Sequence, residues 1–437
     1  MNFVAPRWTY LALGSLGLIA AAACSASDGS TFGEDDGAGA AAAGGGNVGG
    51  SGNSTGDGGI MLGTGGGGTG TGTGNDCVTD PNVDDDMDGF TDNDGDCNDC
   101  DPNVNPNAIE VATPMGGMGG GNQGGGPPEP SDEDCDGMID NVPMSCDSGL
   151  TIDSLDAMDG ARAIGLCKVS TGPGDWGVAD AQWTLPNGDA PPGGNFDLGH
   201  GILTAFGPNV TTQEGTAMLA LSSGSARQPT DPGYQSVSGF SKGISNTGHP
   251  FGFPKESPSC GGAVTGACND GAALQLTLRS PSNATGFRFN FNFYTYEWPV
   301  YVCSTFNDFY AAILEPFPMG QMDGNITFDS LNNPISVNNA FFDVCGCSGG
   351  PPCQAGGISF TCALGESELQ GTGFEGHAAT SWLQTTAPIE ANSEFTLRFL
   401  AYDSGDGILD STGLTDNFQW IANSGEPVSV GTTPIPK

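Results

Sequence analysis

Basic residues are scarce in this chain. Of its 437 residues only 10 are Lys or Arg and 3 are His, against 51 Asp or Glu, so the formal net charge is -41. No Lys or Arg occurs between positions 24 and 162. Phosphate backbones and anionic lipid surfaces repel such a chain, which excludes electrostatic binding to nucleic acid.

Several enzyme motifs are also missing. The three histidines form no His-Glu-x-x-His zinc motif, and no Gly-rich run continues into Gly-Lys-Ser or Gly-Lys-Thr. A glycosidase needs two carboxylates about 5 to 9.5 Å apart, for which Glu297 with Glu315 or Asp308 is available. Such pairs arise by chance where acidic residues are abundant. We therefore expect a protein that is not an enzyme.

One apolar run stands at the N-terminus. Residues 1–23 combine Arg7, an apolar stretch from Tyr10 to Ala20 and three alanines before Cys24, which is typical of a lipoprotein signal peptide. The stretch is short for a transmembrane helix. We expect lipidation of Cys24 and, with Ser25 next to it, anchoring in a bacterial outer membrane, exposed at the cell surface and touching the membrane through lipid only. Cleavage by an ordinary signal peptidase, and secretion, is the alternative.

Residues 24–75 are mostly Gly, Ala, Ser, Thr and Asp, with almost no side chain large enough to bury. This composition predicts a disordered, low-complexity tether whose root-mean-square span is roughly 40 Å. Such a tether would hold a domain away from a membrane.

An acidic segment follows at residues 76–147, with nineteen carboxylates, many in the rhythm Asp-x-Asp-x-Asp-Gly. In an EF-hand-type loop, positions 1, 3, 5 and 9 and the backbone carbonyl of position 7 supply oxygen ligands, and Gly at position 6 permits the turn. Two stretches fit. The first offers Asp84, Asp86, Asp88, the Phe90 carbonyl and Asp92, and the second offers Asp132, Asp134, Asp136, the Met138 carbonyl and Asp140. We expect calcium here, with a solvated acidic spacer as the alternative.

The first loop departs from an EF-hand at position 12, where Gly95 replaces the bidentate Glu, so two flanking helices are not expected. Four later carboxylates can complete the coordination instead: Asp94, Asp96, Asp99 and Asp101. A Gly/Pro-rich insertion at 112–130 separates the two loops. Because it contains methionines, which are soft donors like Met138, copper is a minor alternative to calcium.

The order of these residues resembles a known family. Asp84-x-Asp86-x-Asp88-Gly89-Phe90 precedes Gly95-Asp96-Cys97-Asn98-Asp99, Asp101-Pro102 and Pro106-x-Ala108-x-Glu110, and then Asp134-Cys135-Asp136-Gly137 and Asp140. This order is similar to the metal-binding repeat of bacterial surface proteins and to thrombospondin type 3 calcium repeats. The family usually has a Cys shortly after the Glu and no insertion, and Cys100 is extra here. The resemblance implies metal binding on a bacterial surface protein.

Fourteen cysteines in an exported chain indicate disulfides formed in an oxidising compartment. With Cys24 lipidated, five lie in the acidic segment and eight follow it. Either the eight pair among themselves and the unpaired thiol is in the acidic segment, or Cys146 pairs with Cys167 and leaves seven. The Cys97-x-x-Cys100 spacing also allows a zinc or redox site, but no second motif supports one.

Residues 150–424 predict a β domain. A short helix is expected at 156–166, with Asp153 or Asp156 as its cap. Apolar residues alternate with polar ones at 274–278, 287–293 and 395–401, and shorter strands are expected at 219–221 and 326–328. Without alternating helices, this pattern favours a mainly β fold, an antiparallel β-sandwich of jelly-roll type. Residues 425–437 are expected to be a tail.

A second set of motifs resembles the choice-of-anchor L domain of bacterial surface proteins and covers most of residues 150–424. The motifs are Asp156-x-x-Asp159-x-Ala161-x-Ala163-Ile164, Thr295-Tyr296-Glu297-Trp298-Pro299, Phe306-Asn307-Asp308-x-x-Ala311 and Asp403-x-x-Asp406-x-x-x-Asp410-Ser411. The resemblance implies a domain carried on an anchored surface chain.

Some of these polar residues also suggest a second metal site. Carboxylates and one amide flank a predicted hairpin and follow a predicted strand: Glu297, Asn307, Asp308, Asp403, Asp406 and Asp410. If the strands adjoin, these groups can share a cation, although each alone is more often a turn former or a cap.

Taken together, the patterns predict a calcium-binding surface lipoprotein whose sandwich acts in adhesion or matrix contact, with an extracellular protein or glycan as partner. A carbohydrate-binding module is the alternative, with Trp176, Trp183, Trp298, Tyr301 and Trp382 as a sugar platform, although aromatic residues of a sandwich are more often core. A glycan-acting hydrolase that uses Glu297 with a second acid is less favoured.

Overall fold

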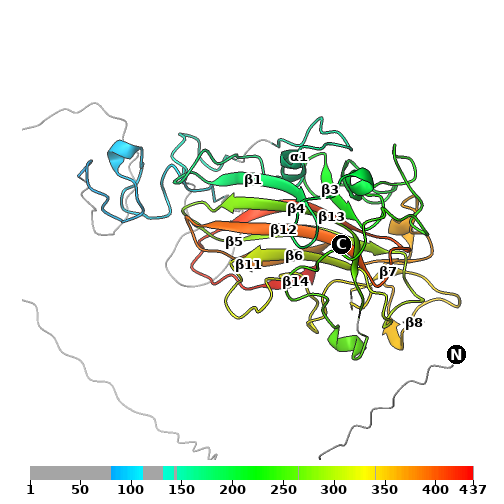
Figure 1. Ribbon diagram of the computed structural model, residues 1–437. Coiled ribbons are helices and arrows are strands. Elements are labelled where there is room, and N and C mark those ends of the chain that lie inside the picture. Colours follow the sequence, from blue (N-terminus) through cyan, green and yellow to red (C-terminus); the bar gives the residue numbers. More distant parts are fainter. Residues whose placement is uncertain (1–79, 112–130, 142–144, 264, 340, 437) are drawn as a thin grey trace, which may run out of the picture. The chain divides into compact units, whose positions relative to one another are not determined.

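The structure is a computed structural model, and it describes residues 80–111, 131–141, 145–263, 265–339 and 341–436 (Figure 1). These described residues belong to one compact unit. The signal peptide, Cys24, the expected tether and the insertion at 112–130 lie outside the described residues. Within the described ranges, no helix has the length and apolar character needed to span a bilayer.

Two antiparallel sheets form the core of this unit. The smaller sheet has the strand order β1 (Gly177–Thr184), β4 (Cys268–Arg279), β12 (Glu394–Ser404) and β6 (Phe309–Glu315). The larger runs β14 (Gly431–Pro434), β11 (Leu383–Pro388), β5 (Ala284–Thr295), β13 (Ser411–Ala422), β3 (Met218–Ser222) and β2 (His200–Leu203). Short β10 (Ala378–Ala379) pairs with β5 and β7 (Val344–Cys345), and β8 (Cys353–Ala355) pairs with β9 (Ile358–Phe360).

The two sheets bury their apolar faces against each other. Alternate residues of β5, β4 and β12 belong to one buried cluster, as the sequence period predicts. Ring pairs bridge the layers: Phe289 meets Phe399 with centroids 4.9 Å apart, and Phe291 stacks on Tyr310 at 4.7 Å. Figure 1 shows these strands as a layered body. The predicted antiparallel β-sandwich is confirmed.

Helices are few and short. The helix α1 (Ala157–Arg162) begins where Asp156 accepts a hydrogen bond from the Met158 N–H, as predicted, but it ends four residues before the expected position. Gly165 follows with φ +94°, a conformation that no helix continues. The 3-10 turns are η1 (Asp92–Asp94), η2 (Gly194–Gly199), η3 (Pro258–Cys260) and η4 (Ser367–Leu369).

Two expectations about strands were wrong. Residues 326–328 form no strand, because only isolated bridges at Asn325 and Phe328 occur there. The expected tail contains β14, which pairs with β11 through four residue pairs, so the larger sheet extends to Pro434. The sequence of β14 does not alternate apolar and polar residues, so the pattern did not predict a strand there.

Disulfides connect the loops. The pairs are Cys97–Cys135, Cys146–Cys167, Cys260–Cys303, Cys345–Cys362 and Cys347–Cys353. The crossing pair between Cys146 and Cys167 is therefore correct, and the free thiol among the described residues is the buried Cys268. Since Cys97 pairs with Cys135 and Cys100 is also disulfide-bonded, the Cys-x-x-Cys spacing is not a dithiol site.

Candidate metal centres

The two Asp-rich loops share their backbone conformation at positions 4 and 6. Position 4 is left-handed in both, with φ 67° at Met87 and 56° at Cys135, and position 6 is Gly with φ 104° at Gly89 and 89° at Gly137. Left-handed backbone at a fixed Gly is what position 6 of the loop requires. Two stretches far apart in sequence thus fold as one repeated unit.

The aspartate at position 1 organises each loop. Asp84 accepts hydrogen bonds from the N–H groups of Met87 at 2.7 Å and Gly89 at 3.0 Å. Asp132 accepts from the N–H groups of Asp136 at 3.1 Å and Gly137 at 2.9 Å. These bonds bend the loop around the carboxylates and arrange them before any ion binds.

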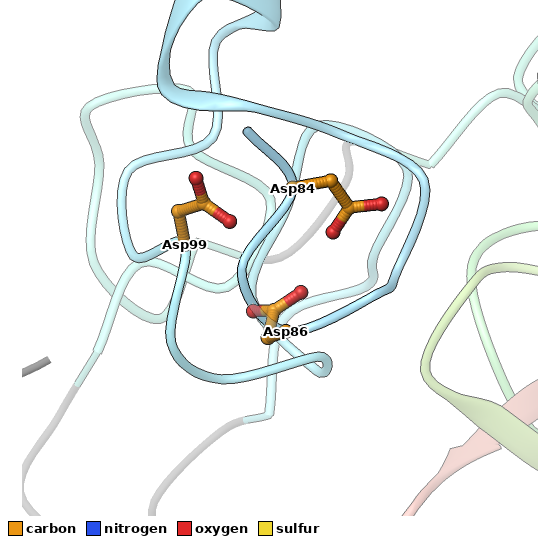
Figure 2. Close-up of side chains that lie close together, drawn as sticks. All are labelled: Asp84, Asp86 and Asp99. Carbon is orange, nitrogen blue, oxygen red and sulfur yellow. The ribbon is translucent and has the colours of Figure 1, made fainter. Parts of the chain in front are cut away.

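The first centre gathers five carboxylates, in two overlapping sets whose oxygens lie within 4.8 Å of one another. One set is Asp84, Asp86 and Asp99, and the other is Asp86, Asp88 and Asp96. Figure 2 shows the carboxylates of Asp84, Asp86 and Asp99 brought together from separate turns of the chain. Of the four later carboxylates predicted to complete the coordination, Asp96 and Asp99 belong to these sets.

The second centre is built around two glutamates that the sequence reasoning did not assign as ligands. Its sets are Glu110 with Asp132 and Asp134, and Glu110 with Glu133 and Asp140. Glu110 stands more than 20 residues before the loop, and its carboxylate also accepts from the Asp134 N–H at 3.3 Å. The resemblance to the metal-binding repeat included Glu110, and that was the one available signal.

Other predicted ligands lie outside these sets. Asp94 accepts from the Thr91 hydroxyl at 2.8 Å, Asp101 from the Asn103 side chain at 2.9 Å, and Asp136 from the Asn141 side chain at 2.7 Å. Asp92 starts the turn η1. The Phe90 N–H donates to Asp88 and the Met138 N–H donates to Asp136. The backbone of each of these two residues is therefore part of its Asp-rich loop.

Proximity and burial oppose ionisation of these acids. Burial raises the pKa of Asp86 to about 6 and the pKa of Glu110 to about 7, and neighbouring carboxylates push in the same direction. One oxygen each of Asp86, Asp96 and Glu110 is buried without a hydrogen-bond partner. A hard divalent cation would neutralise the charges and engage those oxygens.

Asparagines dock the first centre onto the sandwich. The Asn105 amide donates to Asp88 at 2.7 Å, and its carbonyl accepts from the Ser282 hydroxyl at 2.7 Å. Asn283 accepts from the Ile109 N–H at 2.9 Å, and Asn107 donates to Asn392 at 3.1 Å. Acidic segment and sandwich are therefore in direct contact at the turn between β4 and β5.

A separate group of acids closes one end of the sandwich interior. The inward-facing apolar period of β5 continues to Glu297, that of β6 begins at Asp308, and that of β12 continues to Asp403. The β12–β6 register, which pairs Tyr402 with Phe309, puts Asp403 opposite Asp308 in the next pair. We call these three acids together with Asp410 the interior acid cluster.

The cluster matches most of the second site predicted from sequence. Asn307 lies beside Asp308, and its N–H donates to the carbonyl of Ser404 at 3.0 Å. The Tyr296 N–H donates to the Asp410 carbonyl at 3.1 Å, which joins that loop to the end of β5. Asp406 is half-buried rather than part of the interior, and it lines a hollow of about 320 Å³ beside the cluster.

Comparison with known proteins gives little. No protein-family model matches the chain, and no curated protein matches it. A carbohydrate-binding module in complex with beta-1,4-galactotriose is 7% identical, with a TM-score of 0.22 over 56% of this chain and 90% of that chain. The K2 cleaved adhesin domain of Lys-gingipain is 12% identical, with a TM-score of 0.24 over 58% of this chain and 94% of that chain. Neither likeness is close enough to decide a function.

Proposed function

We propose that the acidic segment binds calcium and that the chain is a calcium-stabilised, non-enzymatic surface lipoprotein acting in adhesion. The observation that carries the proposal is the pair of equivalent loops, each bringing carboxylate oxygens within 4.8 Å of one another. Calcium takes six to eight oxygen ligands, often including carboxylates, in flexible geometry. Copper prefers nitrogen and sulfur donors, and neither centre gathers these.

Placement at the cell surface rests on the lipoprotein signal pattern before Cys24 and on the disulfides, which require an oxidising compartment. An acidic segment that calcium orders, placed between the tether and the sandwich, would hold the sandwich in a defined orientation. Adhesion or matrix contact is a role in which that stiffness is useful.

Hydrolysis is disfavoured by the placement of the relevant side chains. Glu297 and Asp308 are buried, out of reach of a polysaccharide chain. Two Gly-x-Ser-x-Gly strings, centred on Ser241 and Ser348, lie in loops and not between a strand and a helix, so neither forms a nucleophile elbow.

Calcium titration of the full chain by calorimetry tests the proposal. Asp86 belongs to both sets of the first centre and Glu110 to both sets of the second. We expect Asp86→Asn and Glu110→Gln each to weaken one centre by at least about tenfold and leave the other unchanged. The exposed Asp80, outside both centres, provides the matched control Asp80→Asn, which should bind like the parent. Absence of calcium heat, or equal binding by all variants, would end the proposal, and magnesium and copper serve as comparison ions.

Glycan binding is a second candidate, on a different surface from the one expected. Trp298 and Trp382 are buried and the other three aromatic residues are half-buried, so the platform predicted from sequence does not form. Instead Phe251 and Phe317, 66% and 38% exposed, stack with centroids 5.7 Å apart. An exposed aromatic pair is a surface on which a sugar ring can stack.

We expect Phe251→Ala with Phe317→Ala to abolish binding on a glycan array if this candidate is correct, because the platform is gone. Leu331→Ala removes another exposed apolar side chain outside the pair and is the control. Binding to a matrix protein with no glycan signal would instead favour protein contact.

A further inference from the structure

The interior acid cluster has more negative charge than the surrounding residues can neutralise. Glu297, Asp308, Asp403 and Asp410 are each at most 2% exposed. The buried cation nearby is Lys242, whose ammonium donates to the Ser222 carbonyl at 2.6 Å. Four buried carboxyls beside one ammonium need a further source of positive charge, because burying an unpaired charge is strongly unfavourable.

Several carboxylate oxygens of the cluster lack a hydrogen-bond partner, and these oxygens mark where a positive charge would bind. Both carboxylate oxygens of Asp403 are buried without a hydrogen-bond partner, as is one oxygen each of Glu297, Asp308 and Asp410. The nitrogen and the oxygen of the Asn307 side-chain amide are also buried without a hydrogen-bond partner. Buried polar atoms in folded proteins are nearly always satisfied, so a group of this size indicates an absent ligand.

Other buried acids of the same domain show a different solution. Asp416, 1% exposed, accepts from the Gln213 N–H at 2.6 Å and from the Asn417 N–H at 2.6 Å. Asp270 accepts from the Ser241 hydroxyl at 2.6 Å and from the Ile244 N–H at 2.7 Å. In the interior cluster, by contrast, the Ser411 hydroxyl donates to Asp308 at 2.5 Å, and Asp403 receives no such donor.

Protons alone do not resolve the arrangement. Asp308 and Asp403 are close enough to share one proton between their carboxyls. A second proton on Asp403 would need an acceptor of its own, and the Asn307 amide would remain unbonded. A metal ion with several coordination positions can bind the carboxylates and the Asn307 amide oxygen at the same time.

An open hollow lies beside the buried cluster, although no residue of the cluster lines it. The adjacent hollow is lined by Asp270, Asp406 and the backbone of Gly405 and Gly407, among others. The negative charges of Asp406 and Asp270 both act on Asp403. A cation arriving there meets the half-buried Asp406 first, with the buried Asp270 and the cluster behind it.

We propose that the interior acid cluster is a calcium site, separate from the two centres of the acidic segment, held by carboxylates of Glu297, Asp308, Asp403 and Asp410 with the Asn307 amide. Among the described residues, sets of three carboxylates within 4.8 Å occur only in the acidic segment, so the carboxylates of this site would move closer together when they bind one ion.

The surroundings hold this site in place. Trp298, 1% exposed, packs edge-on against Phe360 next to Glu297, and the Cys260–Cys303 disulfide anchors the loop between Glu297 and Asn307. Gly224 leaves room for Asp410, because a Cβ there would lie 1.8 Å from its carboxylate oxygen. A rigid frame of this kind favours one ion in one position.

The test uses the full chain carrying Asp86→Asn and Glu110→Gln, which weaken any calcium binding by the two centres of the acidic segment. We expect this parent to retain one calcium ion in native mass spectrometry and to melt roughly 5–10 °C higher at a 100-fold excess of calcium over Kd. Adding Asp403→Asn should remove both the ion and the rise. In chelator the same variant should melt above its parent, because one repulsive carboxylate is gone.

Two further variants make the result specific. Asp416→Asn neutralises a buried acid outside the cluster and should keep the ion and the calcium-dependent rise. Gly224→Ala leaves every charge in place but displaces Asp410, and should weaken calcium binding. A parent that binds no calcium, or an Asp403→Asn variant with an undiminished rise, overturns the proposal. Failure of the acidic segment to bind calcium leaves this outcome untouched.

Discussion

Removing calcium with a chelator should raise the rate of proteolysis within residues 80–141 about 100-fold, while the sandwich stays resistant. A ligand at 100 times its Kd stabilises the bound form by about 2.7 kcal/mol, which corresponds to that factor when cleavage proceeds from an opened state. The like-charged sets around Asp86 and Glu110 repel once the ion leaves, and buried oxygens that lack partners then favour opening.

The choice of protease gives this experiment an internal control. Trypsin has no site between Cys24 and Arg162, so its cleavage after Arg162 reports on the sandwich alone. A protease that cuts beside Asp or Glu, read out by mass spectrometry at each site, reports on the acidic segment. Equal rates in chelator and in calcium, with the disulfides intact, would leave the segment as an acidic spacer.

In chelator, the melting temperature should fall as the pH is raised from 5 to 9. Burial raises the pKa of Glu297 and the pKa of Asp410 to about 9, from 4.5 and 3.8, and raises the pKa of Asp308 and of Asp403 well above the usual range. Between about pH 4 and 9 the folded state therefore holds more protons than the unfolded state, and stability decreases as the pH rises.

The size of the effect separates it from general charge repulsion. One unit of pKa shift corresponds to about 1.4 kcal/mol, and each kcal/mol lowers the melting temperature of a domain of 150–250 residues by about 2–4 °C. Asp403→Asn should flatten the profile, and saturating calcium should hold the melting temperature high at pH 9. Thermal melts at five pH values, with and without calcium, measure this. A profile in chelator that rises with pH contradicts the expectation.

The strands of the sandwich could be predicted because their signal, the alternation of apolar and polar residues, lies within a few consecutive residues. The stripe from Phe287 to Phe293 repeats every second residue, and that period alone defines a strand with one buried face. The same period, extended by two steps beyond Phe293, reaches Glu297, which is why a sequence pattern could point to the interior acid cluster. Its burial, however, depends on β6 and β12 lying side by side, and no local pattern contains that pairing.

Other parts depended on contacts between distant residues. Glu110 meets Asp132 only because the chain returns after the insertion, and Trp298 enters the core instead of a sugar platform because Phe342 and Phe360 surround it. Aromatic residues suit both environments, so residue type could not distinguish them. Cysteine pairing was open for the same reason, and the structure decided it by placing Cys146 beside Cys167.

The Cys97–Cys135 disulfide has a mechanical consequence. If the chain is pulled from its N-terminus while the sandwich holds a partner, tension passes through the sulfur bridge and bypasses residues 101–134, which follow the disulfide-bonded Cys100. Those residues include the insertion and the asparagines that dock onto the β4–β5 turn. The docking contacts therefore sit in a covalently closed loop that bears no load, and the length of the insertion can change without altering the reach of the molecule under force.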